Sequence, residues 1–140
     1  MFRATSEILF DTERMRTLPL VLKNAVEESA VLHTRQLCDT FLSTPGEPDD
    51  IRLSQLFPGL EIDPNYTGLR QRIKALKSRY GSHRTVGSIR WTFNKLLAHA
   101  TTHRGVSYDY APHLCELRSI IEKVTAEIEA LRNSTFGEFP

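Results

Sequence analysis

The sequence predicts an all-helical protein, and three observations support this fold class. Apolar residues recur at intervals of three and four over several long stretches, which is the spacing of one helix face. Capping residues, prolines and glycines stand at the ends of these stretches, where helices begin and end. No stretch alternates convincingly as a strand would. Because the connections are short, we expect an antiparallel up-and-down bundle of four long helices plus short ones.

The first long helix is expected over residues 18–42. Thr17, Leu18 and Pro19 form a helix-start signal, because a capping hydroxyl precedes a proline whose missing N–H costs nothing in the first turn. The expected core stripe consists of Leu22, Val26, Ala30, Leu37 and Phe41, with His33 filling a gap in it. A lone histidine on an apolar face is usually a hydrogen-bonded core residue, although His33 is also a candidate binding residue. A shorter helix is expected before it, over residues 5–15.

Two shorter elements and a second long helix should follow. Residues 43–48 break the helical pattern, and a short helix is expected over residues 51–57. Asp63 is a capping residue for a helix over residues 64–80. Its apolar stripe, formed by Leu69, Ile73 and Leu76, is narrow, and basic residues cover the remaining surface.

The last two long helices are expected over residues 85–103 and 109–132. The core face of the first is expected to consist of Val86, Ile89, Phe93, Leu96, Leu97 and Ala100. The second carries a continuous seam of Leu114, Leu117, Ile121, Val124, Ile128 and Leu131. Residues 133–140 are expected to be a frayed tail.

Size and composition indicate one ordinary soluble domain over residues 1–140. The chain is 40% hydrophobic and 25% charged, without an apolar run long enough to cross a membrane. Glu7, Asp11 and Glu13 lie where a signal peptide would be basic and then apolar, so we expect no membrane association and a cytoplasmic location. Cys38 and Cys115 each stand beside a leucine in a helical pattern and are expected to be buried free thiols.

Charge is divided unevenly along the chain. Residues 64–105 hold nine of the 18 bases and none of the 17 acids, so this basic segment is about +9 and the rest about −8. The nine bases are Arg70, Arg72, Lys74, Lys77, Arg79, Arg84, Arg90, Lys95 and Arg104. Such a segment suggests an anionic partner. Alternatively, it docks against the acidic helices of this chain or of a second subunit.

The end of the basic segment carries the residues of greatest chemical interest. Around the expected helix, Arg90 and Asn94 fall on one flank, and His99 and His103 on the other. Two histidines four residues apart could bind a metal, but no third ligand and no HExxH signature accompany them, so we expect no metal. A glycine-rich phosphate loop and a GxSxG motif are also absent, and we expect no cofactor.

Asn94-Lys95-Leu96-Leu97-Ala98-His99, an N-K-x-x-A-H motif, resembles the HEPN superfamily of prokaryotic helical proteins. ESAVLHTRQLCDTFL (residues 28–42) and FNKLLAHATTHR (residues 93–104) are similar to uncharacterised bacterial HEPN-like proteins, and the likeness covers about residues 24–129. Members are often found in toxin–antitoxin and abortive-infection systems. The active ones cut RNA without a metal through an Arg-polar-x(4)-His motif.

That resemblance implies catalytic roles for Asn94 and His99, but Phe93 stands in the position of the motif arginine. Arg90 is a third candidate, and Arg35 or Arg104 could supply the guanidinium across a two-fold dimer. His99 would take the proton from a ribose 2′-OH, and an arginine would stabilise the charge on the phosphate. His33, Arg35, Lys95, His103 and Arg104 are the candidate binding residues.

Three kinds of function stay open at this stage. The first is an RNA- or nucleotide-binding protein with a degenerate catalytic motif. The second is a metal-independent ribonuclease toxin. The third is a non-enzymatic interaction module, which predicts that acids of other helices neutralise the nine bases. A homodimer is expected in each case, and a protein partner is possible. Trp91, expected to be exposed, could stack on a base or anchor an interface.

Overall fold

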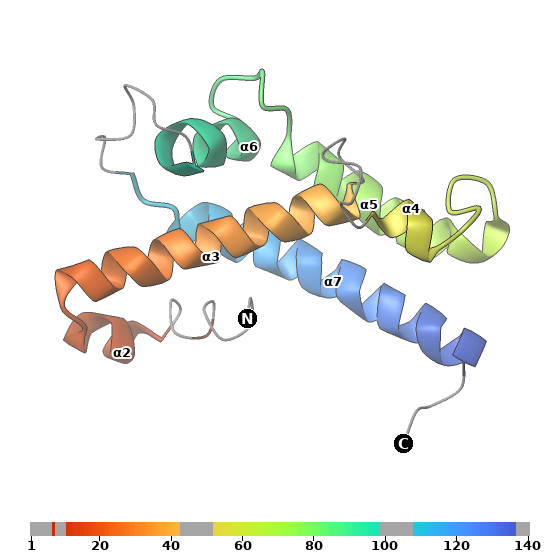
Figure 1. Ribbon diagram of the computed structural model, residues 1–140, viewed down its shortest axis with the longest axis horizontal. Coiled ribbons are helices and arrows are strands. Elements are labelled where there is room, and N and C mark those ends of the chain that lie inside the picture. Colours follow the sequence, from red (N-terminus) through yellow and green to blue (C-terminus); the bar gives the residue numbers. More distant parts are fainter. Residues whose placement is uncertain (1–6, 8–10, 43–51, 99–107, 137–140) are drawn as a thin grey trace.

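The computed structural model describes residues 7, 11–42, 52–98 and 108–136. Their elements are α2 (Thr12–Thr17), α3 (Leu20–Phe41), α4 (Leu53–Leu56), η1 (Pro64–Tyr66), α5 (Thr67–Tyr80), α6 (Ile89–Thr92), η2 (Phe93–Ala98) and α7 (Ala111–Phe136) (Figure 1). The described residues contain no strand, so the all-α prediction is confirmed. Among them, no helix is both long enough and apolar enough to cross a membrane.

Three long helices organise the molecule. Figure 1 shows α3 and α7 crossing while running in the same sense, and α5 running back in the opposite sense. α5 packs along α7, while α3 contacts α7, α5 and η2. The fourth expected long helix is described only as the short α6 followed by η2. An up-and-down bundle of four long helices is therefore not confirmed.

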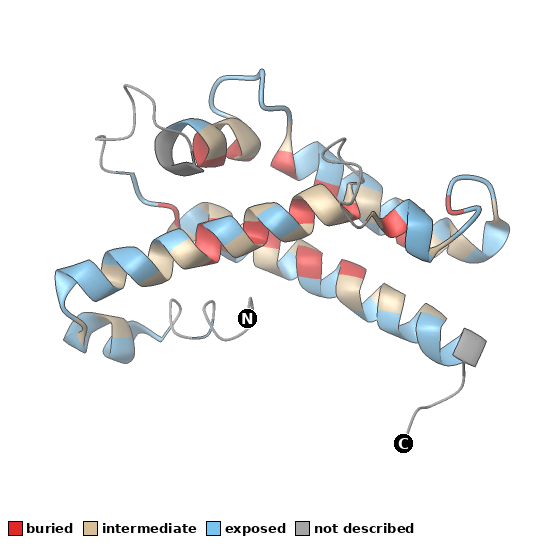
Figure 2. Ribbon diagram, in the orientation of Figure 1, coloured by how far each residue is buried: buried red, intermediate tan, exposed pale blue. Residues whose placement is uncertain are grey.

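α3 follows its expected bounds closely, but only part of it enters the core. Pro19 precedes its first residue, and the helix ends at Phe41. Its buried residues are Ala30, Val31, Thr34, Cys38 and Phe41, all between its midpoint and its end (Figure 2). Leu22, expected in the core, is 50% exposed, and Val26 is only half-buried. The prediction for Leu22 was wrong because the beginning of α3 extends beyond α7 and α5 (Figure 1).

The packing of α5 against α7 agrees with the expected stripes. Leu69 and Leu76 of α5 are buried, as are Leu114, Leu117, Ile121 and Val124 of α7. Asp109 accepts a hydrogen bond from the N–H of Ala111 at 3.0 Å where α7 begins. The helix continues to Phe136, so its expected end at residue 132 was too early. Residues 137–140 of the expected tail lie outside the described part.

The helix expected from residue 85 begins four residues later, at Ile89. Gly87 has a φ of 83°, a left-handed conformation that interrupts a helix, and the Ser88 Oγ then accepts the N–H of Trp91 at 3.1 Å. Val86 is consequently 76% exposed instead of buried. From Phe93 the helix widens into a π-helix, η2, a form that is rare and often found at functional sites. Its expected end at residue 103 is outside the described residues.

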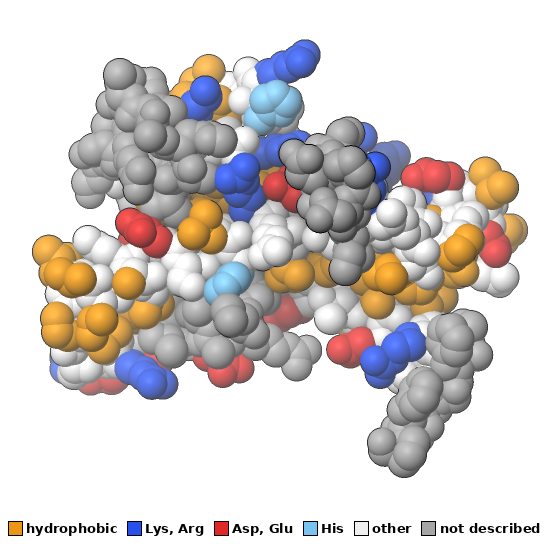
Figure 3. All heavy atoms as spheres, in the orientation of Figure 1, with side chains coloured by type: hydrophobic (Ala, Val, Ile, Leu, Met, Phe, Trp, Pro, Cys, Tyr) orange, Lys and Arg blue, Asp and Glu red, His pale blue; other side chains and the backbone are white. Residues whose placement is uncertain are grey.

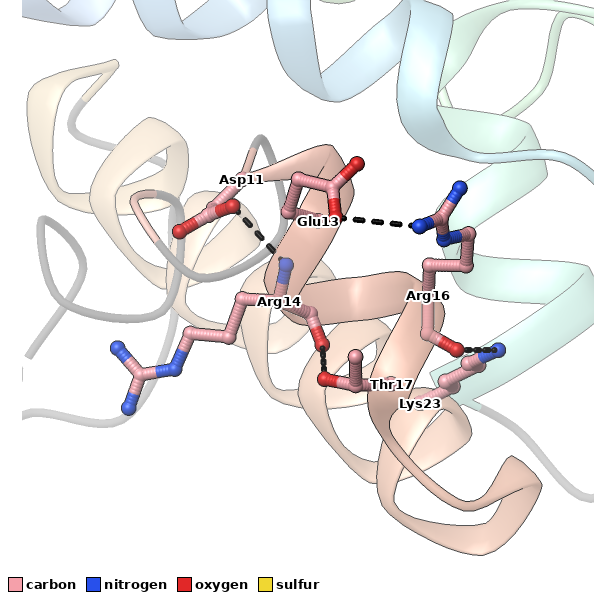
Figure 4. Close-up of polar contacts among 6 residues, drawn as sticks. All are labelled: Asp11, Glu13, Arg14, Arg16, Thr17 and Lys23. Atoms are coloured by element: carbon pink, nitrogen blue, oxygen red, sulfur yellow. Dashed lines mark hydrogen bonds and ion pairs between the residues drawn. The ribbon is translucent and has the colours of Figure 1, made fainter.

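The remaining short helices shift slightly from their expected positions. α4 spans four residues inside the expected range of 51–57. The expected helix over residues 64–80 is present, but its first turn is the 3-10 helix η1. Asp11 caps α2 by accepting the N–H of Arg14 at 3.0 Å, and the Glu13 carboxylate pairs with Arg16 at 3.2 Å (Figure 4). Of the helix expected over residues 5–15, residues 5, 6 and 8–10 lie outside the described residues, and the described α2 ends two residues beyond the expected end.

Candidate functional site

Phe93, at the position of the motif arginine, is part of the hydrophobic core. Its side chain is 0% exposed. Its ring lies edge-on to Tyr80 at a centroid distance of 6.3 Å, and it also contacts Tyr110 at 6.1 Å and His113 at 6.4 Å. Contacts of this kind stabilise a core beyond the area they bury. The position that carries a guanidinium in the active members thus carries a packed aromatic ring here.

The other residues of the motif are only partly described. Asn94 is half-buried, and its Oδ1 is shielded from solvent and has no hydrogen-bond partner in the described part of the chain. Lys95 is exposed. His99, His103 and Arg104 lie outside the described residues, so the expected relation of Asn94 to His99 is not tested. Within the described residues, no group of three or more His, Cys, Asp or Glu side chains could hold a metal ion.

Arg90 and Arg35 come together on one carboxylate. The Nη2 of Arg90 donates to the Oδ1 of Asp39 at 3.1 Å, and the Nε of Arg35 lies 3.8 Å from the Oδ2 of the same residue. Arg90 also stands over the ring of Tyr80, with its guanidinium carbon 5.6 Å from the ring centroid. This is the geometry of a cation–π contact. We call Arg35 and Arg90 the arginine pair.

Two buried groups lie next to the arginine pair. The hydroxyl of Tyr80 is buried and has no hydrogen-bond partner among the residues that the structure describes. Burial raises the pKa of Tyr80, the neighbouring Cys38 and Asp39 raise it further, and Arg90 and Arg35 act in the opposite direction. Burial likewise raises the pKa of the Cys38 thiol, so both groups are neutral at physiological pH.

Sequence reasoning selected the two arginines but not Asp39 or Tyr80. Asp39 follows Arg35 by four residues, a spacing that places the two on the same side of a helix. That signal could have identified this ion pair. Nothing in the local sequence indicated Tyr80, because its ring meets Arg90 only through the packing of α5 against α6.

His33 does not join this cluster. Residues two apart on a helix are separated by about 200° around its axis, so His33 and Arg35 project to opposite sides. His33 is half-buried, and its Nδ1 is shielded from solvent and has no hydrogen-bond partner among the described residues. No described core group therefore forms the expected hydrogen bond with this nitrogen.

Apart from Lys95, the described bases of the basic segment fall into two groups. Arg79 pairs with Glu116 and Arg90 with Asp39, whereas Arg70 donates to the carbonyl oxygens of Leu60 and Asp63. A second group is exposed and forms no ion pair with any described residue: Arg72, Lys74, Lys77 and Arg84. Figure 3 shows Lys and Arg side chains gathered over the upper part of the molecule, near α5 and α6. We call the second group the exposed bases.

Cys115 and Trp91 differ from their expected environments. Cys115 is exposed, because it is one residue away from the buried stripe of α7, whereas Cys38 is buried as expected. Trp91 is half-buried.

No protein-family model matches the chain, and neither a curated protein nor a solved structure matches it. The resemblance to the HEPN superfamily therefore rests on the sequence stretches 28–42 and 93–104 alone.

Proposed function

We propose that this chain is an RNA-binding helical protein of the HEPN type that does not cleave its ligand. The observation that carries the proposal is the set of exposed bases, which no acid of the described residues neutralises. Exposed lysines and arginines bind phosphates by releasing condensed counterions, without requiring a particular base sequence. A non-enzymatic interaction module was expected to neutralise these four bases with acids of other helices. Because no described acid pairs with them, RNA is favoured over a protein partner.

The environment of Phe93 supports binding without cleavage. Cutting RNA without a metal needs a cation to stabilise the charge that builds on the phosphate oxygens. Position 93 supplies an aromatic ring packed in the core, and Arg90 is held by Asp39 and Tyr80. We therefore regard the catalytic motif as degenerate, and the ribonuclease toxin as the weaker alternative. A toxin–antitoxin or defence context follows from the resemblance alone and is part of the proposal.

A homodimer also belongs to this proposal. Leu20, Val21 and Leu22 at the beginning of α3 are large, exposed apolar side chains, and clustered exposed apolar groups are typical of interaction sites. Figure 3 shows hydrophobic atoms gathered at that end of the molecule. Sedimentation equilibrium at tens of micromolar should therefore detect a dimer, and a pure monomer at that concentration would argue against it.

Fluorescence anisotropy with a labelled single-stranded RNA tests the binding proposal. We expect affinity to fall steeply with salt, by a slope of about 0.7 per contacted phosphate for single strands. Lys74→Glu combined with Lys77→Glu should weaken binding and flatten that slope by about 1.4, because two contacts are lost. The RNA should remain intact on a denaturing gel.

A matched control changes the net charge equally outside the basic segment. Arg14 of α2 and Lys123 of α7 are both exposed and form no ion pair with a described residue (Figure 4 for Arg14). Arg14→Glu combined with Lys123→Glu should leave the salt slope close to that of the wild type. Equal losses in both double variants would mean that net charge alone governs binding. Absence of RNA binding at low salt would overturn the proposed function.

A further inference from the structure

The arginine pair is unbalanced in charge. Two guanidinium groups share the single carboxylate of Asp39, and Tyr80 and Cys38 beside them carry no charge at physiological pH. Counted over these described groups alone, the cluster carries about +1. Its side chains are only partly exposed to solvent: Arg35 is 28% exposed, Asp39 33% and Arg90 19%. A positive cluster in a partly dry setting favours a small anion.

Arg35 is the member of the pair whose guanidinium makes few hydrogen bonds. Its Nε lies 3.8 Å from Asp39, too far for a good hydrogen bond, and its guanidinium donates no hydrogen bond to any other described residue. A guanidinium has five N–H donors in a planar fork that matches the oxygens of a carboxylate or a phosphate. Arg35 thus retains donor capacity at a partly open position.

Arg90 is the positioned member. Asp39 holds its Nη2 at 3.1 Å, and the face of Tyr80 supports its guanidinium. Tyr80 is anchored in the core by its edge-on contact with Phe93. Its hydroxyl is buried and unpartnered within the described residues, so the cluster contains a further polar group whose hydrogen-bonding capacity is unmet. Such groups are uncommon in native interiors.

We propose that the arginine pair is a binding site for one phosphate group, and that Asp39 is an internal competitor occupying it when phosphate is absent. The Asp39 carboxylate stands where two phosphate oxygens would lie, because both groups offer paired oxygen acceptors to a guanidinium fork. Arg35 provides the open donors, and Arg90 is held in place by Tyr80. The phosphate can be a free phosphate, a nucleotide or a diester of RNA, since the recognising chemistry is the same.

This proposal rests on the proposed function in one respect only, namely that RNA is one source of the phosphate. The exposed bases lie on α5 and on the segment that follows it, whereas Arg35 lies on α3 and Arg90 on α6. The two surfaces can therefore be tested separately.

Inorganic phosphate is the first probe, titrated by calorimetry into the full chain at low ionic strength. Arg35→Gln should weaken phosphate binding by at least about tenfold, because charge-assisted hydrogen bonds are lost. Asp39→Asn should strengthen it several-fold, because the amide no longer competes for the guanidinium groups. Circular dichroism should show that both variants are folded.

A second ion pair of α7 provides the matched control. Arg118 donates through Nε to Glu122 at 2.8 Å, with the same four-residue spacing as Arg35 and Asp39. Arg118→Gln and Glu122→Gln should leave phosphate affinity unchanged. Failure of the wild type to bind phosphate, or wild-type affinity in Arg35→Gln, would overturn the site. A folded Asp39→Asn that binds more weakly than the wild type would overturn the role of Asp39 as competitor.

An oligoribonucleotide with hydroxyls at both ends separates the phosphate sources. If Arg35→Gln weakens its binding as well, RNA diesters reach the site. If only inorganic phosphate and a 5′-phosphorylated nucleotide respond, the site takes terminal phosphates. If neither the wild type nor any variant binds RNA but the wild type still binds phosphate, the proposed function is wrong and the phosphate site is retained.

Discussion

Replacing Phe93 with arginine is the sharpest test of whether the motif position belongs to a core or to a catalytic cleft. The substitution restores the residue of the active HEPN-like motif. In this structure, however, it places a guanidinium where a fully buried ring contacts Tyr80, Tyr110 and His113. The new charge would also lie one helical turn after Arg90 and repel it.

The expected loss of stability follows from two contributions. Truncating a buried phenylalanine to alanine costs about 3 to 5 kcal/mol through lost burial and the cavity left behind. Arginine refills part of that volume, but an unpaired buried charge costs a further few kcal/mol. The sum exceeds about 5 kcal/mol, which is the lower limit of the stability of a typical domain. Phe93→Arg should therefore be largely unfolded.

Thermal unfolding followed by circular dichroism measures this loss. Phe93→Leu is the matched control, because it keeps an apolar side chain and should cost about 1 to 3 kcal/mol. For a domain of this size, each kcal/mol lowers Tm by roughly 3 to 5 °C. If Phe93→Arg melts within a few degrees of the wild type and cleaves RNA, residue 93 faces a cleft and the assignment of Phe93 to the core is wrong.

Three further predictions concern backbone, thiols and pH. Gly81→Ala should cost about 1 to 3 kcal/mol, measured by urea unfolding, because φ is 75° and an added Cβ would lie 2.8 Å from a neighbouring side chain. Gly87→Ala, with φ at 83° but open space, should cost less. A thiol reagent followed by mass spectrometry should label Cys115 in the folded protein and Cys38 only after unfolding. Burial raises the pKa of Glu27, so its ionisation opposes folding; Glu27→Gln should raise Tm at pH 7, and the gain should vanish as pH falls below the ordinary value of 4.5.

Helix content was predictable because it depends on local spacing, but burial was less so. The stripe of α7 was identified correctly from Leu114 to Val124, and α5 and α3 pack against this helix. On α3 the same reasoning selected Leu22, which lies on an apolar stripe but at an end that α5 and α7 do not reach. Periodicity indicates which face of a helix is apolar, and only the lengths and crossing of the helices decide how much of that face is covered.

The candidate site shows a similar limit on what charge counting can predict. Counting bases in the segment 64–105 identified a basic surface, but it treated Arg90 and Lys74 alike. In the structure Arg90 is bound to Asp39, 51 residues away in sequence, whereas Lys74 is exposed without an ion pair among the described residues. Such a pairing depends on how α3 and α6 approach each other, which no local pattern reports.

Phe93 illustrates both limits, because its burial and its contacts depend on how the helices pack and not on the local sequence. The HEPN motif has an arginine at the matching position, whereas in this structure Phe93 is the ring that packs edge-on against Tyr80, and Arg90 stands over Tyr80. Position 93 holds the phenylalanine that supports Tyr80 under Arg90, so the same position cannot also supply an arginine. If the arginine pair binds phosphate, the apolar residue at position 93 contributes to that binding by keeping Tyr80 in place.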